Sequence, residues 1–264
     1  ARNYKNLDEL NRVSAWIKEQ MRLLGVPWHY QNFTANQQIY RNVVCSLNVG
    51  RADRVIVGAH YDVFGDQDGA DDNASGVAGV IETARILAEQ KSKLPNNVDF
   101  VFYSLEEPPF SKTEQMGSYV HAKSVQSQKD KIKGVYILEM IGFFSEQPIQ
   151  SYPVGLKWIY PSHGNFIATV SNVSSRDLGA GYCTAMQQLD LLECQRLVAP
   201  SFANAFDFSD HLNYWEFNIP AVMITDTAFY RNGHYHTKAD RLTTLNLTKM
   251  ANVIDGLVQH LLKP

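Results

Sequence analysis

Residues 54–76, RVIVGAHYDVFGDQDGADDNASG, join an apolar run to an acidic stretch and close on small residues. The run at 54–59 predicts a buried strand because it is short and, after Arg54, apolar throughout. It is followed by one histidine and five aspartates, although only 19% of the chain is charged. Two interpretations compete for this stretch: a solvated turn that caps the next helix, or part of a metal site.

Helical and extended patterns alternate on both sides of this stretch. Apolar residues at helical spacing predict helices at 7–24, 74–90, 117–125 and 248–262. Extended patterns predict strands at 28–34, 39–47, 54–59, 98–105, 134–138, 165–170 and 221–225. Apolar strands separated by helices indicate a sheet covered on both faces, largely parallel, with the first strands antiparallel at one edge. We therefore expect an α/β fold with three layers, α/β/α, around a mixed, mostly parallel central sheet.

Length and composition favour one domain. The chain has 264 residues, 45% of them hydrophobic, which is enough for one large core, so we expect a single domain over 1–264. Residues 143–164, rich in proline and aromatic side chains, predict a surface loop. A formal charge of -3 gives no basic excess for nucleic acid, and no apolar run reaches the roughly 18 to 20 residues of a membrane span. We expect a monomer.

Three cysteines are too few for a disulfide scaffold. Cys183 and Cys194 are close enough in sequence to pair in an oxidising compartment, and reduced buried thiols are the alternative. The chain opens at Ala1 without Met and enters a helical pattern directly, as after removal of a secretory segment or after trimming. We expect a secreted or periplasmic protein.

Four apolar runs end in side chains that can do chemistry. The run at 54–59 is followed by His60 and Asp62, and the run at 98–105 is followed by Glu106 and Glu107. The run at 134–138 is followed by Glu139, and the run at 221–225 is followed by Asp226, with His236 shortly after. Each has an ordinary interpretation alone, such as a helix cap, a solvated strand end or a core histidine. Ligands bind outside the carboxyl ends of strands in open α/β sheets. Since all four runs end at one such edge, we expect a site there.

Carboxylates and imidazoles together favour zinc or a similar divalent ion, with an open position for water in a catalytic site. Two metals about 3.5 to 4 Å apart, bridged by a carboxylate, polarise a carbonyl and ionise that water together. The water needs a nearby carboxylate to take its proton. The adjacent Glu106 and Glu107 allow one glutamate to bind metal while the other acts as the base.

Six motifs, in order and spacing, resemble those of a known family. They are HYD at 60–62, GADDNASG at 69–76, EE at 106–107, LEMIG at 138–142, SDH at 209–211 and YHTKAD at 235–240. The chain is similar to the co-catalytic zinc exopeptidases, which include bacterial leucyl aminopeptidases and, as a divergent branch, glutaminyl cyclases. The resemblance extends from about residue 42 to the C-terminus and implies the phosphorylase/hydrolase-like fold of that family.

The resemblance also implies a role for each site residue. Asp72 would bridge two zinc ions, Glu107 and His236 would complete one site, and His60 and Glu139 would complete the other. Glu106 would be the general base, Asp62 would orient His60, and Tyr235 would donate to the tetrahedral oxyanion. The peptide between Asp72 and Asn73 would be cis. Asp71 is interpreted as a cap or a surface acid.

The expected function is that of a zinc metallo-aminopeptidase that releases the N-terminal residue of a peptide substrate. GADDNASG has the aminopeptidase form, whereas the segment 108–116 is longer than the short turn of typical aminopeptidases and leans toward the cyclases. Glu139 stands where aspartate is more usual. The alternatives are a glutaminyl cyclase with a single zinc and, from another class, a binding module that has kept the fold and lost its metals.

Overall fold

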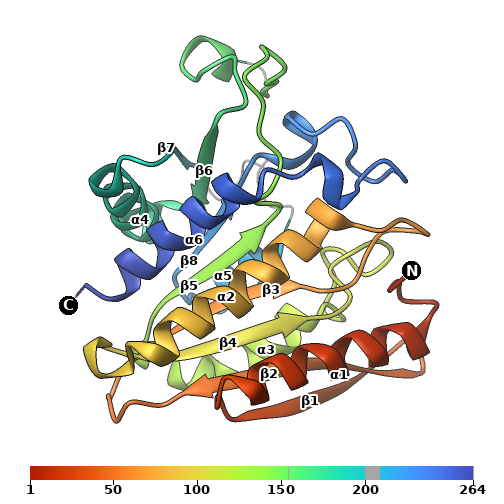
Figure 1. Ribbon diagram of the computed structural model, residues 1–264. Coiled ribbons are helices and arrows are strands. Elements are labelled where there is room, and N and C mark those ends of the chain that lie inside the picture. The colour runs from red at the N-terminus through yellow and green to blue at the C-terminus, as the bar shows by residue number, and fades with distance from the viewer. Residues whose placement is uncertain (154, 200–208, 264) are drawn as a thin grey trace.

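The computed structural model describes residues 1–153, 155–199 and 209–263, which form an eight-stranded mixed sheet between two layers of helices (Figure 1). The strands are β1 (Trp28–Ala35), β2 (Gln38–Leu47), β3 (Arg54–His60), β4 (Asn97–Tyr103), β5 (Ile132–Glu139), β6 (Phe166–Ser171), β7 (Glu193–Val198) and β8 (Ala221–Thr225). The helices are α1 (Leu7–Leu23), α2 (Gly76–Glu89), α3 (Gly117–Val125), α4 (Arg176–Leu189), α5 (His211–Glu216) and α6 (Leu247–Leu261). The predicted fold class is confirmed.

Strand direction decides where the side chains of the site meet. The sheet order is β1-β2-β4-β3-β5-β8-β6-β7, and β4, β3, β5 and β8 are parallel neighbours at its centre. β1 and β2 form an antiparallel edge, as predicted, with β2 antiparallel to β4. A third antiparallel pair, between β6 and β8, was not expected from the sequence. The four central strands therefore direct their carboxyl ends to one edge.

Helices cover both faces of this sheet. α1, α2, α4 and α6 lie on one face and α3 and α5 on the other (Figure 1). β3, β4, β5 and β8 are buried almost from end to end, which explains their continuous apolar sequences. Each fully buried large apolar side chain contributes about 1.5 to 3 kcal/mol. The core thus fixes the strand ends from which the site is built.

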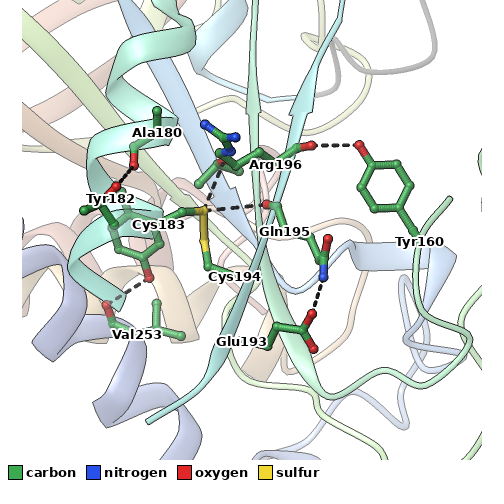
Figure 2. The surroundings of a disulfide bond; sticks show 11 residues. Tyr160, Ala180, Tyr182, Cys183, Glu193, Cys194, Gln195, Arg196 and Val253 are labelled. Carbon is green, nitrogen blue, oxygen red and sulfur yellow. Dashed lines mark hydrogen bonds between the residues drawn. A yellow bond between two sulfur atoms is a disulfide. The ribbon is translucent and has the colours of Figure 1, made fainter. Parts of the chain in front are cut away.

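An edge strand, β7, is bound to helix α4 by a disulfide. Cys183 on α4 pairs with Cys194 on β7, with 5.3 Å between their Cα atoms (Figure 2). The hydroxyl of Tyr160 donates to the carbonyl of Arg196 at 2.7 Å, which ties the segment 143–164 to the same strand. The pairing that the sequence left open is therefore present, and Cys45 is a free, buried thiol.

Replacing Cys183 and Cys194 together by alanine is expected to lower the free energy of unfolding by about 3 kcal/mol, because the bond closes a short loop in the unfolded chain. Urea denaturation followed by circular dichroism measures the change, with the reduced native protein as the control. The double variant and the reduced protein should unfold at the same urea concentration. An unchanged midpoint in both would contradict the prediction.

The segment 143–164 connects β5 to β6 with one short helical turn, Leu156–Trp158, and a single bridge between Ser145 and Gly164; residue 154 lies outside the described chain. Trp158, the last residue of this helical turn, is 81% exposed.

Across the described residues, no helix combines the length and apolar character that a membrane crossing requires.

Candidate metal centre

The predicted donors converge at the carboxyl edge of the central strands. They form two groups in which every ligand atom lies within 4.8 Å of the others: His60, Asp72 and Glu139, and Asp72, Glu107 and His236. Asp72 belongs to both groups. Its two oxygens face different imidazoles, since Oδ1 lies 3.4 Å from Nε2 of His60 and Oδ2 lies 3.1 Å from Nε2 of His236.

The remaining donors complete each group. Both carboxylate oxygens of Glu139 lie 3.4 Å from Nε2 of His60, so the glutamate side chain reaches the candidate ligand atom of that ring. In the other group, Oε2 of Glu107 lies 3.2 Å from Nε2 of His236. The hydroxyl of Ser209 donates to Oε2 of Glu139 at 2.7 Å and holds that carboxylate in place.

The donors fit a pair of divalent cations. Oδ2 of Asp72, Oε1 of Glu107 and Nε2 of His236 are buried, and among the described residues none has a hydrogen-bond partner of good geometry. Buried polar atoms without partners are costly and rare. Carboxylate oxygens and imidazole nitrogens are the ligand types that zinc takes. The unpaired atoms are thus explained if they point at metal ions.

Charge at the cluster supports the same interpretation. Burial and the carboxylate of Asp72 together raise the pKa of Glu107 to about 7, although His236 and His60 oppose the rise. Burial alone would raise the pKa of Asp72 too, but the imidazoles of His236 and His60 bring it below its ordinary value. Burial would lower the pKa of His236, yet Asp72 and Glu107 raise it to about 9. Without a cation, the imidazoles must therefore carry the positive charge that the carboxylates require.

Asp62 supports two parts of the site at once. Its Oδ1 lies 3.5 Å from Nδ1 of His60, on the ring edge opposite the candidate ligand atom. The same carboxylate accepts the backbone N–H groups of Glu106 and Glu107, each at 3.2 Å. Asp62 thereby joins the end of β3 to the turn that follows β4.

The segment that carries Asp72 is held by residues from distant parts of the chain. Asp240 accepts the backbone N–H groups of Asp71 and Asp72 at 2.8 and 3.1 Å. Asn73 donates to the carbonyl of Leu138 and accepts from the N–H of Met140. The peptide between Asp72 and Asn73 is cis, as the resemblance implied. Asp240 closes the YHTKAD motif, which was the only signal of its role in the sequence.

The interpretation of Asp71 as a cap or surface acid was wrong. Its side chain is fully buried and accepts from the N–H of Gly142 at 2.9 Å and from the amide of Asn232 at 2.7 Å. Burial raises its pKa to about 6. Asp226, predicted at the end of β8, joins neither donor group and instead accepts from the backbone of Phe143 and Ala228. Both acids organise loops rather than the candidate ligand set.

Glu106 remains outside both donor groups but faces the same cavity. It lines a pocket with Asp72, Glu139 and Tyr235, and its Oε2 lies 3.9 Å from Nε2 of His60. Burial raises its pKa well above the ordinary value; His60 opposes this rise, while Glu107 and Glu139 add to it. Tyr235 stacks on the ring of His236, with 3.7 Å between the centroids. Glu106, a potential proton acceptor, and Tyr235, a potential hydrogen-bond donor, thus line the same pocket.

The pocket extends from these acids toward β6 and β7. Its apolar lining consists of Pro153, Leu156, Phe166, Ala168, Val170, Leu197, Met223 and Phe229. Tyr152 and Tyr160, from the segment 143–164, stack at 5.8 Å and form part of the wall. One end of the cavity is therefore acidic, and the remainder combines this apolar lining with the polar side chains of Gln150, Gln195 and Arg196.

The backbone turns sharply where the strands end. Leu105 follows β4, Met140 follows β5 and Thr227 follows β8, and all three have positive φ angles, between 49° and 87°. His236 also has a positive φ, of 56°. Such conformations are uncommon for residues other than glycine and cluster at functional sites. These turns direct the acids toward the cavity.

The eight-stranded sheet and the donor groups gathered at its strand ends define the chain as an α/β protein with a candidate metal centre. Residues 42–261 match the model of peptidase family M28. The chain belongs to peptidase family M28.

Two curated relatives extend over nearly the whole chain. Protein YfbL of Escherichia coli (strain K12) is 40% identical over 267 residues, which cover 97% of this chain and 81% of the relative. Leucine aminopeptidase 1 of Sclerotinia sclerotiorum is 23% identical over 290 residues, covering 98% of this chain and 67% of the relative.

Solved structures from both branches of the predicted family share the fold. The LapA aminopeptidase of Legionella pneumophila matches with a TM-score of 0.75 and 20% identity, over 96% of this chain and 64% of that chain. The glutaminyl cyclase of Porphyromonas gingivalis matches with a TM-score of 0.72 and 18% identity, over 96% of this chain and 89% of that chain. At these identities the likeness concerns the fold.

Proposed function

We propose that the protein is a zinc metallo-aminopeptidase that hydrolyses the N-terminal residue from peptides. The observation that carries the proposal is that Asp72 belongs to two donor groups at once, while Glu106 faces the same pocket outside both. Membership of family M28 and the similarity to leucine aminopeptidase 1 support it. We take residues 1–264 as one peptidase domain.

His60, Asp72 and Glu139 would hold one zinc ion, and Asp72, Glu107 and His236 would hold the second. Bound zinc supplies Lewis-acid polarisation of the scissile carbonyl and lowers the pKa of water toward about 7. Asp62 orients His60, because metal-binding imidazoles require a partner on their other nitrogen. The shared ligand makes the two sites dependent on each other.

The chain's own residues would move the protons. Glu106 accepts the proton of the attacking water and then delivers it to the leaving amine. Tyr235 lines the same pocket, and its hydroxyl donates a hydrogen bond to the oxyanion that forms on the substrate carbonyl. The apolar lining beyond these residues would receive the side chain of the N-terminal residue, since burial of apolar surface is favourable. The acidic end suits the free α-amine of the peptide.

The alternatives make less use of the same geometry. A glutaminyl cyclase with one zinc ion leaves His60 and Glu139 without a purpose as ligands, although the fold matches a cyclase over 89% of that protein's length. A binding module without metals leaves the unpaired buried atoms of Asp72, Glu107 and His236 unexplained. The disulfide between Cys183 and Cys194 is consistent with a secreted or periplasmic location.

Incubation with three matched peptides tests the proposal. A peptide with a free apolar N-terminus is expected to lose one residue, its N-acetylated form is expected to stay intact, and an N-terminal Gln peptide is expected to be trimmed. Mass spectrometry of the products measures all three. A cyclase instead lets the substrate amine attack its own side-chain amide, with release of ammonia. Loss of ammonia from the Gln peptide, with the apolar peptide intact, would favour the cyclase and overturn the peptidase.

A further inference from the structure

The first residues of the chain lie beside the loops at the carboxyl edge of the sheet (Figure 1). They contact the segment 61–69, which we call the β3–η1 loop because it connects β3 to the turn Ala70–Ser75. This loop begins directly after His60 and ends three residues before Asp72. It therefore connects two candidate ligands that belong to different secondary-structure elements.

Arg2 closes this loop with one side chain. Its Nε donates to the carbonyl of Tyr61 at 2.8 Å, Nη1 donates to that of Asp68 at 2.5 Å, and Nη2 donates to that of Gly69 at 2.7 Å. Tyr61 is the first residue of the loop and Gly69 is the last. A planar guanidinium with donors on three nitrogens is the side chain that can bind such a set of carbonyls together.

Contacts next to the Arg2 side chain hold the β3–η1 loop in the same closed conformation. The amide of Asn3 donates to the carbonyl of Gly65 at 2.6 Å, and the N–H of Val63 donates to the carbonyl of Arg2 at 3.3 Å. Gly69 has a φ of +59°, and an added Cβ would lie 2.3 Å from the carbonyl oxygen of Asp72 and 3.1 Å from Nη2 of Arg2. The guanidinium is thus packed against the backbone that precedes Asp72.

The closed loop also reaches the second donor group. Phe64, at its middle, stacks on the ring of His236 with 4.3 Å between centroids and 6° between planes. The loop thereby adjoins His60 at its start, Asp72 beyond its end and His236 through Phe64. Arg2 adds a positive charge: burial lowers its pKa, and the carboxylates of Asp72, Asp62 and Asp240 oppose that change.

We propose that Arg2 is a positioning residue of the metal centre, which closes the β3–η1 loop so that His60, Asp72 and His236 are arranged to bind zinc. The inference rests on the proposed function, because it concerns the same site. Arg2 touches neither substrate nor metal in this role. It acts through the loop, so its loss should weaken metal binding as well as stability.

Zinc affinity, measured by competition with a chelator, is the readout that separates positioning from stability alone. The variant Arg2→Met is expected to bind zinc about tenfold to a hundredfold more weakly, the range found when a supporting contact of a ligand is removed. Arg2→Lys keeps the positive charge but places it on a single nitrogen. Its zinc affinity should therefore lie between that of the native protein and that of Arg2→Met. Arg12→Met is the matched control, because Arg12 is exposed on α1 and pairs only with Glu9 in the described structure.

A second variant tests the contact between Phe64 of the loop and the ring of His236. Phe64→Leu removes the stacking from a side chain that is 38% exposed, and it should weaken one zinc equivalent and leave the other unchanged. All variants are compared at a temperature where circular dichroism finds them folded, and kcat and KM are measured with zinc at saturation. At saturating zinc, the kcat of Arg2→Met should still be below that of the native protein, because excess zinc does not restore the geometry of the ligands.

The outcomes separate this inference from the function on which it rests. If the native protein binds zinc and trims peptides while Arg2→Met equals it in zinc affinity, the positioning role of Arg2 is wrong and the proposed function stands. Equal affinity in Arg2→Lys and the native protein would show that charge acts without closure of the loop, which also overturns the proposal. If the native protein binds no zinc, both proposals fail together.

Discussion

Replacement of Asp72 by alanine is expected to release both zinc ions and to abolish measurable peptide hydrolysis. Asp72 is the one residue that the two donor groups share, with one oxygen 3.4 Å from His60 and the other 3.1 Å from His236. Its loss removes a negatively charged ligand from both groups. The fall in activity should exceed the roughly 10² to 10⁴ that loss of a general base causes, since zinc-dependent polarisation is lost as well.

Elemental analysis after zinc reconstitution measures the first effect, with two equivalents expected for the native protein and none bound tightly by Asp72→Ala. His60→Ala is the matched control, because His60 belongs to one group only and its loss should leave one equivalent. Circular dichroism of the metal-free proteins verifies folding. A native protein with one tight equivalent that survives His60→Ala would contradict the dinuclear assignment.

The central part of the fold was predictable because the strands that form it are buried on both faces. Residues 55–59 and 221–224 are apolar throughout, and such runs have few other interpretations in a chain with helices between them. The parallel direction of β3, β4 and β5 then follows from the helical crossovers between them, whereas the order of the strands in the sheet was not predicted. The candidate donors could be found for the same reason, since they directly follow these runs.

Beyond β8 in the sheet, β6 was predicted as a strand at 165–170, but β7, α4 and the direction of β6 were not, because the local sequence patterns are weak. The half-exposed β7 mixes charged and apolar residues, and α4 contains two glycines that lower helix propensity. The antiparallel placement of β6 depends on pairing with β8, more than fifty residues later in the chain. Sequence periodicity gives no information on such a partner.

Asp62 was predicted to support His60, but the supporting roles of Asp71 and Arg2 were missed for a related reason. Asp71 hydrogen-bonds to Asn232 across 161 positions, and Arg2 binds Gly69 across 67. A helix-start pattern indicates where the chain turns, but it does not indicate which distant segment covers the turn. Residues that hold ligands in place therefore appear as ordinary caps or surface charges until the fold brings their partners beside them.

Glu106→Gln is expected to reduce turnover by about 10² to 10⁴ while zinc content stays at two equivalents. Glutamine keeps the size and shape of the side chain, but its amide cannot accept the proton of water. Glu106 lies outside both donor groups, so metal binding should not depend on its charge. The backbone N–H of Glu106 still donates to Asp62, which preserves the turn that positions Glu107.

The adjacent glutamate provides the matched comparison. Glu107→Gln should weaken one zinc equivalent, because Oε2 of Glu107 lies 3.2 Å from Nε2 of His236 in the second donor group. Steady-state kinetics with an aminoacyl anilide and elemental analysis of the same samples give both quantities. If Glu106→Gln loses metal while Glu107→Gln keeps two equivalents, the roles of the two glutamates are exchanged. Full activity of Glu106→Gln would instead require another base, because the attacking water must lose its proton to a group in the cavity.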